Sequence, residues 1–217
     1  MHSIYIRLKA HLLDIAIAVV LAATLFTLAK PLRDEWARGR LDANAARTVD
    51  REWAALASES SPLSGSSSNA DVLELSDYEC PFCRRASSSV DSAIAAGAHI
   101  GYLQYPLRIH PHAEGAAIAA LCSEPSGKFK TFHERLMTTM QWQQDTDWVR
   151  EAKAAGVADL QAFEACLKGS EIRHRLDRIR KLADSVGVHG TPMFVARTGI
   201  HRGLASNAEI LDLARRK

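Results

Sequence analysis

Two cysteines separated by two residues, Cys80-Pro81-Phe82-Cys83, lie between a strand-like run and a helix-like run. The preceding segment, Val72–Leu75, is mostly apolar and β-prone, and the following segment, Arg84–Ala96, has the composition of a helix. A cysteine at the start of a helix lies beside unpaired N–H groups and the positive end of the helix dipole, which stabilise its thiolate. The motif therefore predicts a redox-active dithiol. A structural zinc site, which uses the same spacing, is the alternative.

A second motif, Gly190-Thr191-Pro192, comes more than a hundred residues later and precedes the β-prone run Met193–Ala196. A cis Thr191–Pro192 bond at the start of an edge strand would expose the backbone of Thr191 to an extended peptide. For this motif taken alone, an ordinary trans proline at a strand start is the alternative.

Together, the two motifs and the helical stretch between them resemble the DsbA-like thiol–disulfide oxidoreductases. The resemblance covers the chain from about Asp71 to its C-terminus. It implies an α/β chain with a thioredoxin-like fold over residues 70–217, into which an α-helical domain is inserted at about 112–185. We expect strands at Val72–Leu75 and Ile100–Leu107, a hairpin of Met193–Ala196 with Ile200–Leu204, and a terminal helix at Ala208–Arg216.

The segment Leu12–Ala29 is almost wholly apolar, and a helix of this length reaches about 27 Å, close to the hydrocarbon thickness of a bilayer. Arg7 and Lys9 precede it, so we predict a cytoplasmic N-terminus at 1–11 and a single-pass signal anchor at 12–29 in the inner membrane. A cleaved signal peptide ending near Ala29 is the alternative. Either arrangement places the dithiol in an oxidising space such as the periplasm.

Residues 30–69 are expected to form a stalk helix and a Ser-rich linker. One face of the stalk helix carries the recurring residues Leu41, Ala45, Val49, Trp53 and Leu56. This stripe either packs on its own domain or forms a surface for self-association or a partner. The segment Ser58–Asn69 is rich in serine and predicts a flexible linker.

The resemblance implies roles for individual residues of the two motifs. Cys80 would be the nucleophile and Cys83 the resolving thiol, with Pro81 and Phe82 forming the active-site loop between them. Thr191 and Pro192 would lie beside the dithiol.

Glu74 takes the position at which DsbA-like proteins commonly place a buried acid beneath the dithiol. Burial would raise the pKa of this carboxyl and let it exchange protons with the buried thiol. A strand residue that faces solvent is the alternative. Two further acids, Asp77 and Glu79, lie close to the dithiol motif in the sequence, and their negative charges are expected to disfavour its thiolate.

The remaining cysteines, Cys122 and Cys166, are expected to form a structural disulfide, because pairing is the default in an oxidising compartment. Some DsbA-like proteins also carry a second bridge in this region. A second redox relay is the alternative. The segment His110-Pro111-His112 holds its two imidazoles apart and is interpreted as a structural loop or substrate rim, with no metal. We expect no cofactor.

The predicted function is that of a membrane-anchored thiol–disulfide oxidoreductase that forms or exchanges disulfides in cysteine-containing exported proteins. A reductase or isomerase of a dedicated client, and a non-catalytic peptide-binding module, are the alternatives. An oxidase would need a quinone-linked membrane oxidase as its partner, and a reductase would need a transmembrane electron donor. The net charge of +2 gives no bulk attraction for nucleic acid.

Overall fold

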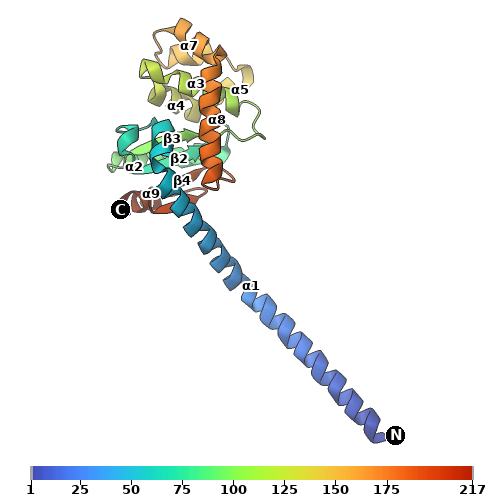
Figure 1. Cartoon of the computed structure of the whole chain (residues 1–217). Helices are drawn as coiled ribbons and strands as arrows, with labels where there is room; N and C mark the ends of the chain where they lie inside the picture. Colours follow the sequence, from blue (N-terminus) through green and yellow to red (C-terminus); the bar gives the residue numbers. More distant parts are fainter. Residues whose placement is uncertain (1, 217) are drawn as a thin grey trace. The chain divides into compact units, whose positions relative to one another are not determined.

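The computed structural model describes residues 2–216, and it describes the side chains of residues 18–37 and 39–216. The chain divides into two compact units, Met1–Asp42 and Ala43–Lys217. The first helix, α1 (His2–Glu59), contributes residues to both units (Figure 1).

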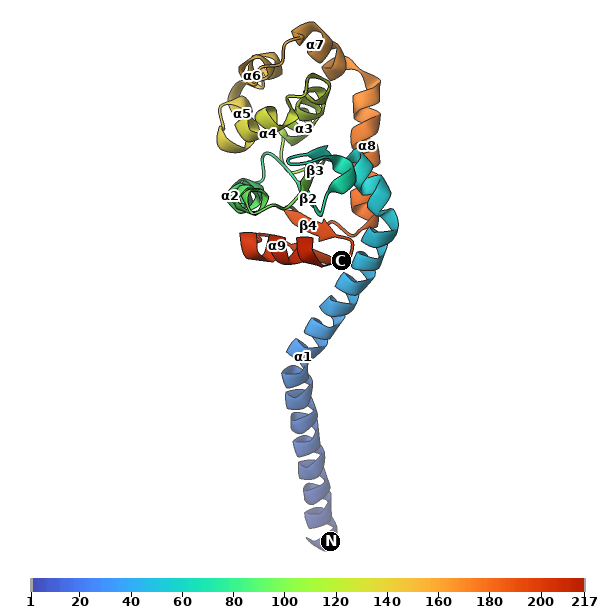
Figure 2. The same cartoon turned by 90° about the vertical axis from the view of Figure 1, so that its left-hand side faces the viewer.

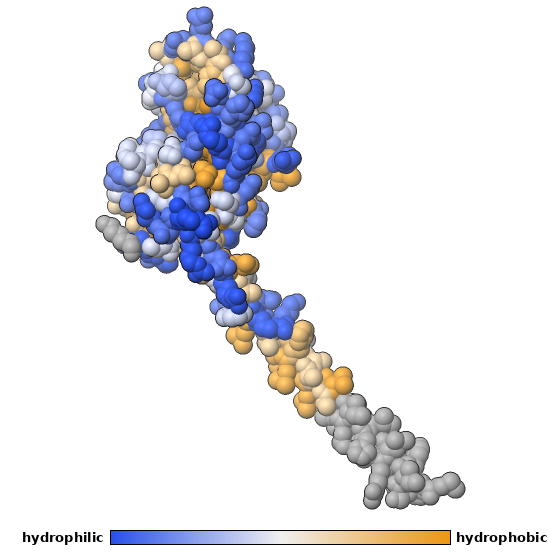
Figure 3. Space-filling view, viewed as in Figure 1, coloured by the Kyte–Doolittle hydropathy of each residue, from blue (hydrophilic) through white to orange (hydrophobic). Residues whose placement is uncertain are grey.

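The first unit consists of α1 as far as Asp42. Its large apolar side chains are exposed where they are described, including Leu21, Leu25, Leu28 and Leu32, and hydrophobic residues line this stretch in Figure 3. Within the part of the chain that the structure describes, no helix is both long and apolar enough to span a bilayer. The predicted segment 1–11 and residues 12–17 of the predicted anchor lie outside the described side chains.

The second unit is built on a mixed five-stranded sheet with the order β1-β3-β2-β4-β5. The strands are β1 (Ser61–Pro62), β2 (Val72–Ser76), β3 (Ile100–Gln104), β4 (Met193–Ala196) and β5 (Gly199–Arg202). Strands β2 and β3 are parallel, whereas the other neighbouring pairs are antiparallel. The central position of β2 brings the residues that follow it next to the start of β4.

The helix that follows β2 is α2 (Pro81–Ala95), and it packs beside the C-terminal helix α9 (Asn207–Arg215) (Figure 2). Proline is favoured at the first position of a helix because its missing N–H has no intrahelical partner there. The buried residues of α2 recur every three or four positions, at Cys83, Ala86, Val90 and Ala93, which is the spacing of one helix face.

Helices occupy most of the chain between residues 113 and 185, which connects β3 to β4. Its helices are α3 (Ala113–Cys122), α4 (Phe129–Thr138), α5 (Trp142–Asp145), α6 (Trp148–Ala154), α7 (Leu160–Lys168) and α8 (Ser170–Ser185). Aromatic residues fill the interior of this helical segment, with the rings of Phe132 and Phe163 6.0 Å apart and those of Trp142 and Trp148 5.7 Å apart. Helix α8 then returns the chain to the sheet, where it packs on β3.

The structure differs from the flexible linker expected at Ser58–Asn69. Ser61–Pro62 forms β1 and pairs with β3, and Ser67–Asn69 forms a 3-10 turn. The serine hydroxyls bond to backbone: Ser67 donates to the Ser60 carbonyl, while Ser64 donates to Ala98 and accepts from Ile100. The segment also packs closely on β3, because a Cβ on Gly101 of β3 would lie 2.6 Å from Ser60 Oγ. The serines of this segment therefore pack closely and bond to the backbone, and the segment is not a free linker.

The end of α1 is part of the second unit, with Val49, Trp53 and Leu56 buried in its core. Of the two interpretations of the apolar stripe, packing on its own domain applies to these three residues. Ion pairs also join the C-terminal end of α1 to α8, because Glu59 contacts Arg175 and Arg178. The compact unit therefore includes residues that were expected to belong to the stalk and the linker.

Candidate functional site

Cys80 is the N-cap residue of α2, and Cys83 lies in the first turn of the same helix. Both cysteines are free and buried, with Cys80 3% and Cys83 0% exposed. The apolar ring of Phe82 is half-exposed beside them, and the Arg85 guanidinium lies 4.7 Å from its centroid. The geometry thus places one sulfur at the helix N-terminus and the other beneath it.

The two sulfurs differ sharply in acidity. A hydrogen bond from the Cys83 thiol is the main cause that lowers the pKa of Cys80 to about 5, and burial opposes it. The Thr191 hydroxyl and the backbone N–H groups of Cys83 and Phe82 lower it further. Burial, followed by the hydrogen bond to Cys80 and the charge of Glu74, raises the pKa of Cys83. At neutral pH the pair therefore holds a thiolate at Cys80 and a thiol at Cys83.

The Thr191–Pro192 peptide bond is cis, and Thr191 contacts the dithiol through two groups. Its carbonyl oxygen lies 3.4 Å from Cys80 Sγ, which donates to it when protonated. Its buried Oγ1 has no hydrogen-bond partner, and it lowers the pKa of both cysteines. The structure thus brings the two sequence motifs together at one site.

Glu74 lies on β2 and is 2% exposed, so it is a buried acid and not a solvent-facing strand residue. Burial raises the pKa of its carboxyl to about 7; the Ser76 hydroxyl opposes this shift, while the charges of Asp91 and Cys80 add to it. No cation is among the groups that shift this pKa. Glu74 can therefore hold or release a proton near neutral pH.

A buried polar cluster on the same face of the sheet was not predicted from the sequence. The parallel register of β2 and β3 pairs Glu74 with Tyr102 and Ser76 with Gln104, so these four side chains share a face. The alternation of polar residues along both strands was the available signal.

Two further side chains, Tyr78 and His133, complete this cluster. The Tyr78 ring stacks on Tyr102 at 5.3 Å, and its hydroxyl lies 3.3 Å from His133 Nδ1. Burial lowers the pKa of His133 to about 3, which keeps the imidazole neutral. The face of the sheet beneath the dithiol is thus lined with polar groups that carry no positive charge.

The acids nearest the motif have a structural role. The Asp77 carboxylate accepts from the backbone N–H groups of Glu79 and Leu107 and contacts His110 Nδ1 at 2.8 Å, while Glu79 accepts from the His112 N–H. These bonds hold the loop after β3 against the dithiol motif. Neither carboxylate is among the groups that shift the pKa of Cys80, contrary to the effect expected from their positions in the sequence.

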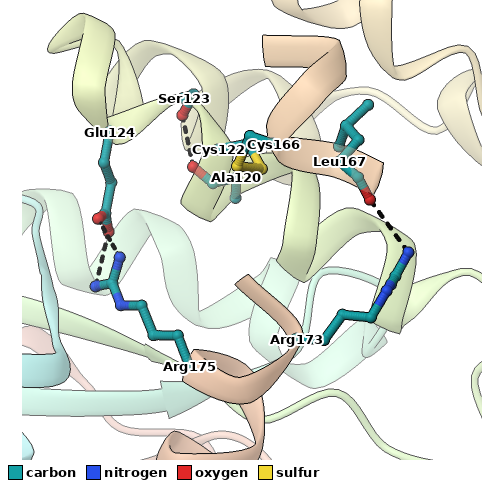
Figure 4. The surroundings of a disulfide bond; sticks show 8 residues. All are labelled: Ala120, Cys122, Ser123, Glu124, Cys166, Leu167, Arg173 and Arg175. Carbon is teal, nitrogen blue, oxygen red and sulfur yellow. Dashed lines mark hydrogen bonds and ion pairs between the residues drawn. A yellow bond between two sulfur atoms is a disulfide. The ribbon is translucent and has the colours of Figure 1, made fainter. Parts of the chain in front are cut away.

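Cys122 and Cys166 form a disulfide with an S–S distance of 1.98 Å. Figure 4 shows this bond joining α3 to α7, with the Arg175–Glu124 ion pair nearby. The bond lies within the helical segment, and Cys80 and Cys83 are left as the free cysteines. Among the residues that the structure describes, no cluster of three or more His, Cys, Asp or Glu side chains is arranged to hold a metal ion.

Solved structures with the same fold include redox proteins. A thioredoxin-like oxidoreductase from Silicibacter pomeroyi DSS-3 is 28% identical, with a TM-score of 0.60 over 67% of this chain and 84% of that one. A linker-deletion mutant of ScsC from Proteus mirabilis is 19% identical, with a TM-score of 0.69 over 90% of this chain and 92% of that one. The thiol-disulfide exchange protein alpha-DsbA2 from Wolbachia pipientis is 19% identical, with a TM-score of 0.60 over 67% and 81%.

The curated relatives are longer proteins. The Na(+)/H(+) antiporter NhaA 1 of Mycolicibacterium gilvum is 30% identical over 141 residues, which is 61% of this chain and 22% of the relative. The antiporter NhaA 3 of Salinispora tropica is 30% identical over 146 residues, 66% of this chain and 22% of that protein. The chain thus spans about a fifth of the length of these curated relatives.

The fold defines the class, that of proteins with the thioredoxin fold, and the DsbA- and ScsC-type structures share this fold, as the sequence motifs predicted. A family model described as thioredoxin matches residues 58–212. The chain belongs to this thioredoxin family.

Proposed function

We propose that the chain catalyses thiol–disulfide exchange on cysteine-containing exported proteins, with Cys80 as the exchanging sulfur and Cys83 as the resolving thiol. One observation carries the proposal: Cys80 lies at the N-terminus of α2 with its pKa lowered to about 5, directly beside the protonated thiol of Cys83. A stable thiolate is a good leaving group and a ready partner in exchange.

We propose that the chain acts mainly as an oxidase. A substrate thiolate attacks Cys80 Sγ of the Cys80–Cys83 disulfide, the disulfide breaks, and Cys83 leaves with the electron pair. A second substrate thiolate then attacks the mixed disulfide, so that the substrate gains a disulfide and Cys80 leaves as a thiolate. Stabilising that thiolate favours the reduced enzyme, which makes its disulfide more oxidising. A quinone-linked membrane oxidase would accept the two electrons.

Five further residues support the exchange in this proposal. Thr191 offers its hydroxyl to the sulfurs and, with Pro192, forms the edge on which an extended substrate peptide can pair. Glu74 supplies and accepts the proton of Cys83, because the charge of Glu74 is among the groups that raise the pKa of this thiol. Pro81 and Phe82, which were expected to form a loop, are the first two residues of α2 and hold Cys80 at its N-terminus.

We further propose that residues 12–29 anchor the domain in a membrane, with the dithiol in the extracytoplasmic space. The apolar composition of this segment supports the anchor, and so does the match to curated relatives that are named as antiporters, a class of membrane protein. Carbonate extraction of membranes from cells expressing the chain tests this proposal. An anchored chain stays in the membrane pellet, and release into the supernatant would rule the anchor out.

The reduction potential of the Cys80–Cys83 pair tests the direction of exchange. The chain is equilibrated in glutathione buffers, and its thiols are alkylated and counted by mass spectrometry. An oxidase gives a midpoint above about −200 mV, toward the value of about −120 mV that is typical of a strong oxidant. A midpoint at or below about −270 mV would indicate a reductase and overturn the proposed direction.

A further inference from the structure

The side chain of Ser76 lies on the same face of the sheet as Glu74 and Tyr102. Ser76 ends β2 and is fully buried, and its Oγ makes no hydrogen bond in the resting geometry. The hydroxyl nevertheless lowers the pKa of Glu74, Cys83 and Tyr102, because it offers a hydrogen bond to the charged form of each. Glu74 and Ser76 are two residues apart on β2, so a buried, unpartnered hydroxyl lies on the strand face that carries the buried acid.

Cys83 needs such a group, because its sulfur is 0% exposed and has no contact with bulk water. Cys83 must gain or lose a proton in every exchange cycle, and Glu74 beneath it is almost as deeply buried. A hydroxyl can accept one proton and donate another at the same time. A carboxyl that titrates near neutral pH is a suitable end point for such a transfer.

We propose that Ser76 relays the proton between the Cys83 thiol and the Glu74 carboxylate, a role that rests on the exchange chemistry proposed above. When Cys83 Sγ attacks Cys80 Sγ of a mixed disulfide, the thiol proton passes to Ser76 Oγ and the hydroxyl proton passes to Glu74. The Cys80–Cys83 bond forms, the bond from Cys80 to the substrate sulfur breaks, and the electron pair leaves on the substrate thiolate. In the oxidising direction the same transfers run in reverse.

The other groups around this relay do not offer the same route. The ionisable neighbours are Cys80, Cys83 and Asp91 on α2, Tyr78 after β2 and Tyr102 on β3, while His133 on α4 contacts both phenols and stays neutral. Burial raises the pKa of both phenols far above neutral, so neither is present as a phenolate that could accept the thiol proton. Thr191 faces the sulfurs, but it is not among the groups that shift the pKa of Glu74. Ser76 is the hydroxyl that lowers the pKa of both Cys83 and Glu74.

The test separates the step at Cys80 from the step at Cys83. The full chain, with Cys122–Cys166 left oxidised, is reduced at the dithiol and mixed with excess 5,5′-dithiobis(2-nitrobenzoate). Attack by Cys80 releases the first thionitrobenzoate, and attack by Cys83 on the mixed disulfide releases the second. In Ser76→Ala we expect the second release at neutral pH to slow by about 10²-fold and the first to stay unchanged. Ser76→Thr keeps the hydroxyl and restores the second release.

Two controls define the pathway. Ser123→Ala removes a buried hydroxyl that bonds only to the Ala120 carbonyl, and it is expected to change neither release. Glu74→Gln slows the second release, and the Glu74→Gln/Ser76→Ala double variant is no slower than the slower single variant, because both residues act in one transfer.

A folded Ser76→Ala variant whose second release matches the wild-type rate would overturn the relay. A solvent-isotope measurement on the wild-type chain gives an answer even where a variant does not fold. If two protons move in the same step, the rate of the second release varies non-linearly with the deuterium fraction of the solvent. A linear dependence would contradict the relay. If the first release were as slow as that of an ordinary cysteine, the proposed function itself would fail.

Discussion

The Cys83→Ser variant is expected to accumulate a stable mixed disulfide between Cys80 and its substrate, whereas the Cys80→Ser variant accumulates none and loses all turnover. The reason is the difference in acidity, since Cys80 is a thiolate at neutral pH and Cys83 is a buried thiol. Without Cys83 nothing inside the protein displaces the substrate sulfur from Cys80. Without Cys80 the remaining thiol is neither charged nor accessible.

The measurement is mass spectrometry of each reduced variant after incubation with a disulfide-bonded protein substrate. The Cys80→Ser/Cys83→Ser double variant is the matched control, because it keeps the volume of both side chains and has no thiol at the site. Equal trapping by the two single variants would contradict the assignment of Cys80 as the exchanging sulfur.

Removing the second pair of cysteines is expected to affect stability far more than exchange. The Cys122–Cys166 bond closes a loop with a sequence separation of 44 residues, and on the chain-entropy model such a loop contributes about 4 kcal/mol to the free energy of unfolding. The Cys122→Ala/Cys166→Ala variant should therefore unfold at a much lower denaturant concentration. Below its unfolding transition, alkylation of Cys80 should keep its wild-type rate.

Denaturant unfolding followed by tryptophan fluorescence measures this loss, and reduction of the wild-type bond should produce a loss of similar size. Ser123→Ala, next to Cys122, is the control for a local change in packing. A loss below about 1 kcal/mol would show that the bond does not stabilise the fold in this way. A parallel loss of Cys80 reactivity would support the alternative of a second redox relay.

The two motifs predicted the core of the fold because each depends on local chemistry. Pro81 and the N-terminal cysteine define the start of α2 from neighbouring residues alone, and the apolar run before them forms the central strand β2. The expected hairpin appears as β4 and β5. The positions of Glu74 and Thr191 at the dithiol followed from the likeness to a known family, since periodicity alone does not bring segments so far apart in the chain together.

The remaining features depend on long-range pairing that composition does not reveal. Strand β1 exists because Ser61 and Pro62 pair with β3, and a serine-rich segment that makes such contacts has the same composition as a linker. The polar cluster depends on the register that sets Ser76 opposite Gln104. A single strand shows the alternation but not the partner across the sheet.

The rate of Cys80 alkylation by iodoacetamide as a function of pH tests the central claim most directly. The pH series is run on the reduced dithiol with Cys122–Cys166 intact, and each cysteine is scored separately by peptide mass spectrometry. Because the thiolate is the reactive form, we predict that the Cys80 rate reaches half its maximum near pH 5, while Cys83 stays unmodified in the folded protein. A half-maximal rate near pH 9, the ordinary pKa of a thiol, or equal modification of the two cysteines, would contradict an activated thiolate at the N-terminus of α2.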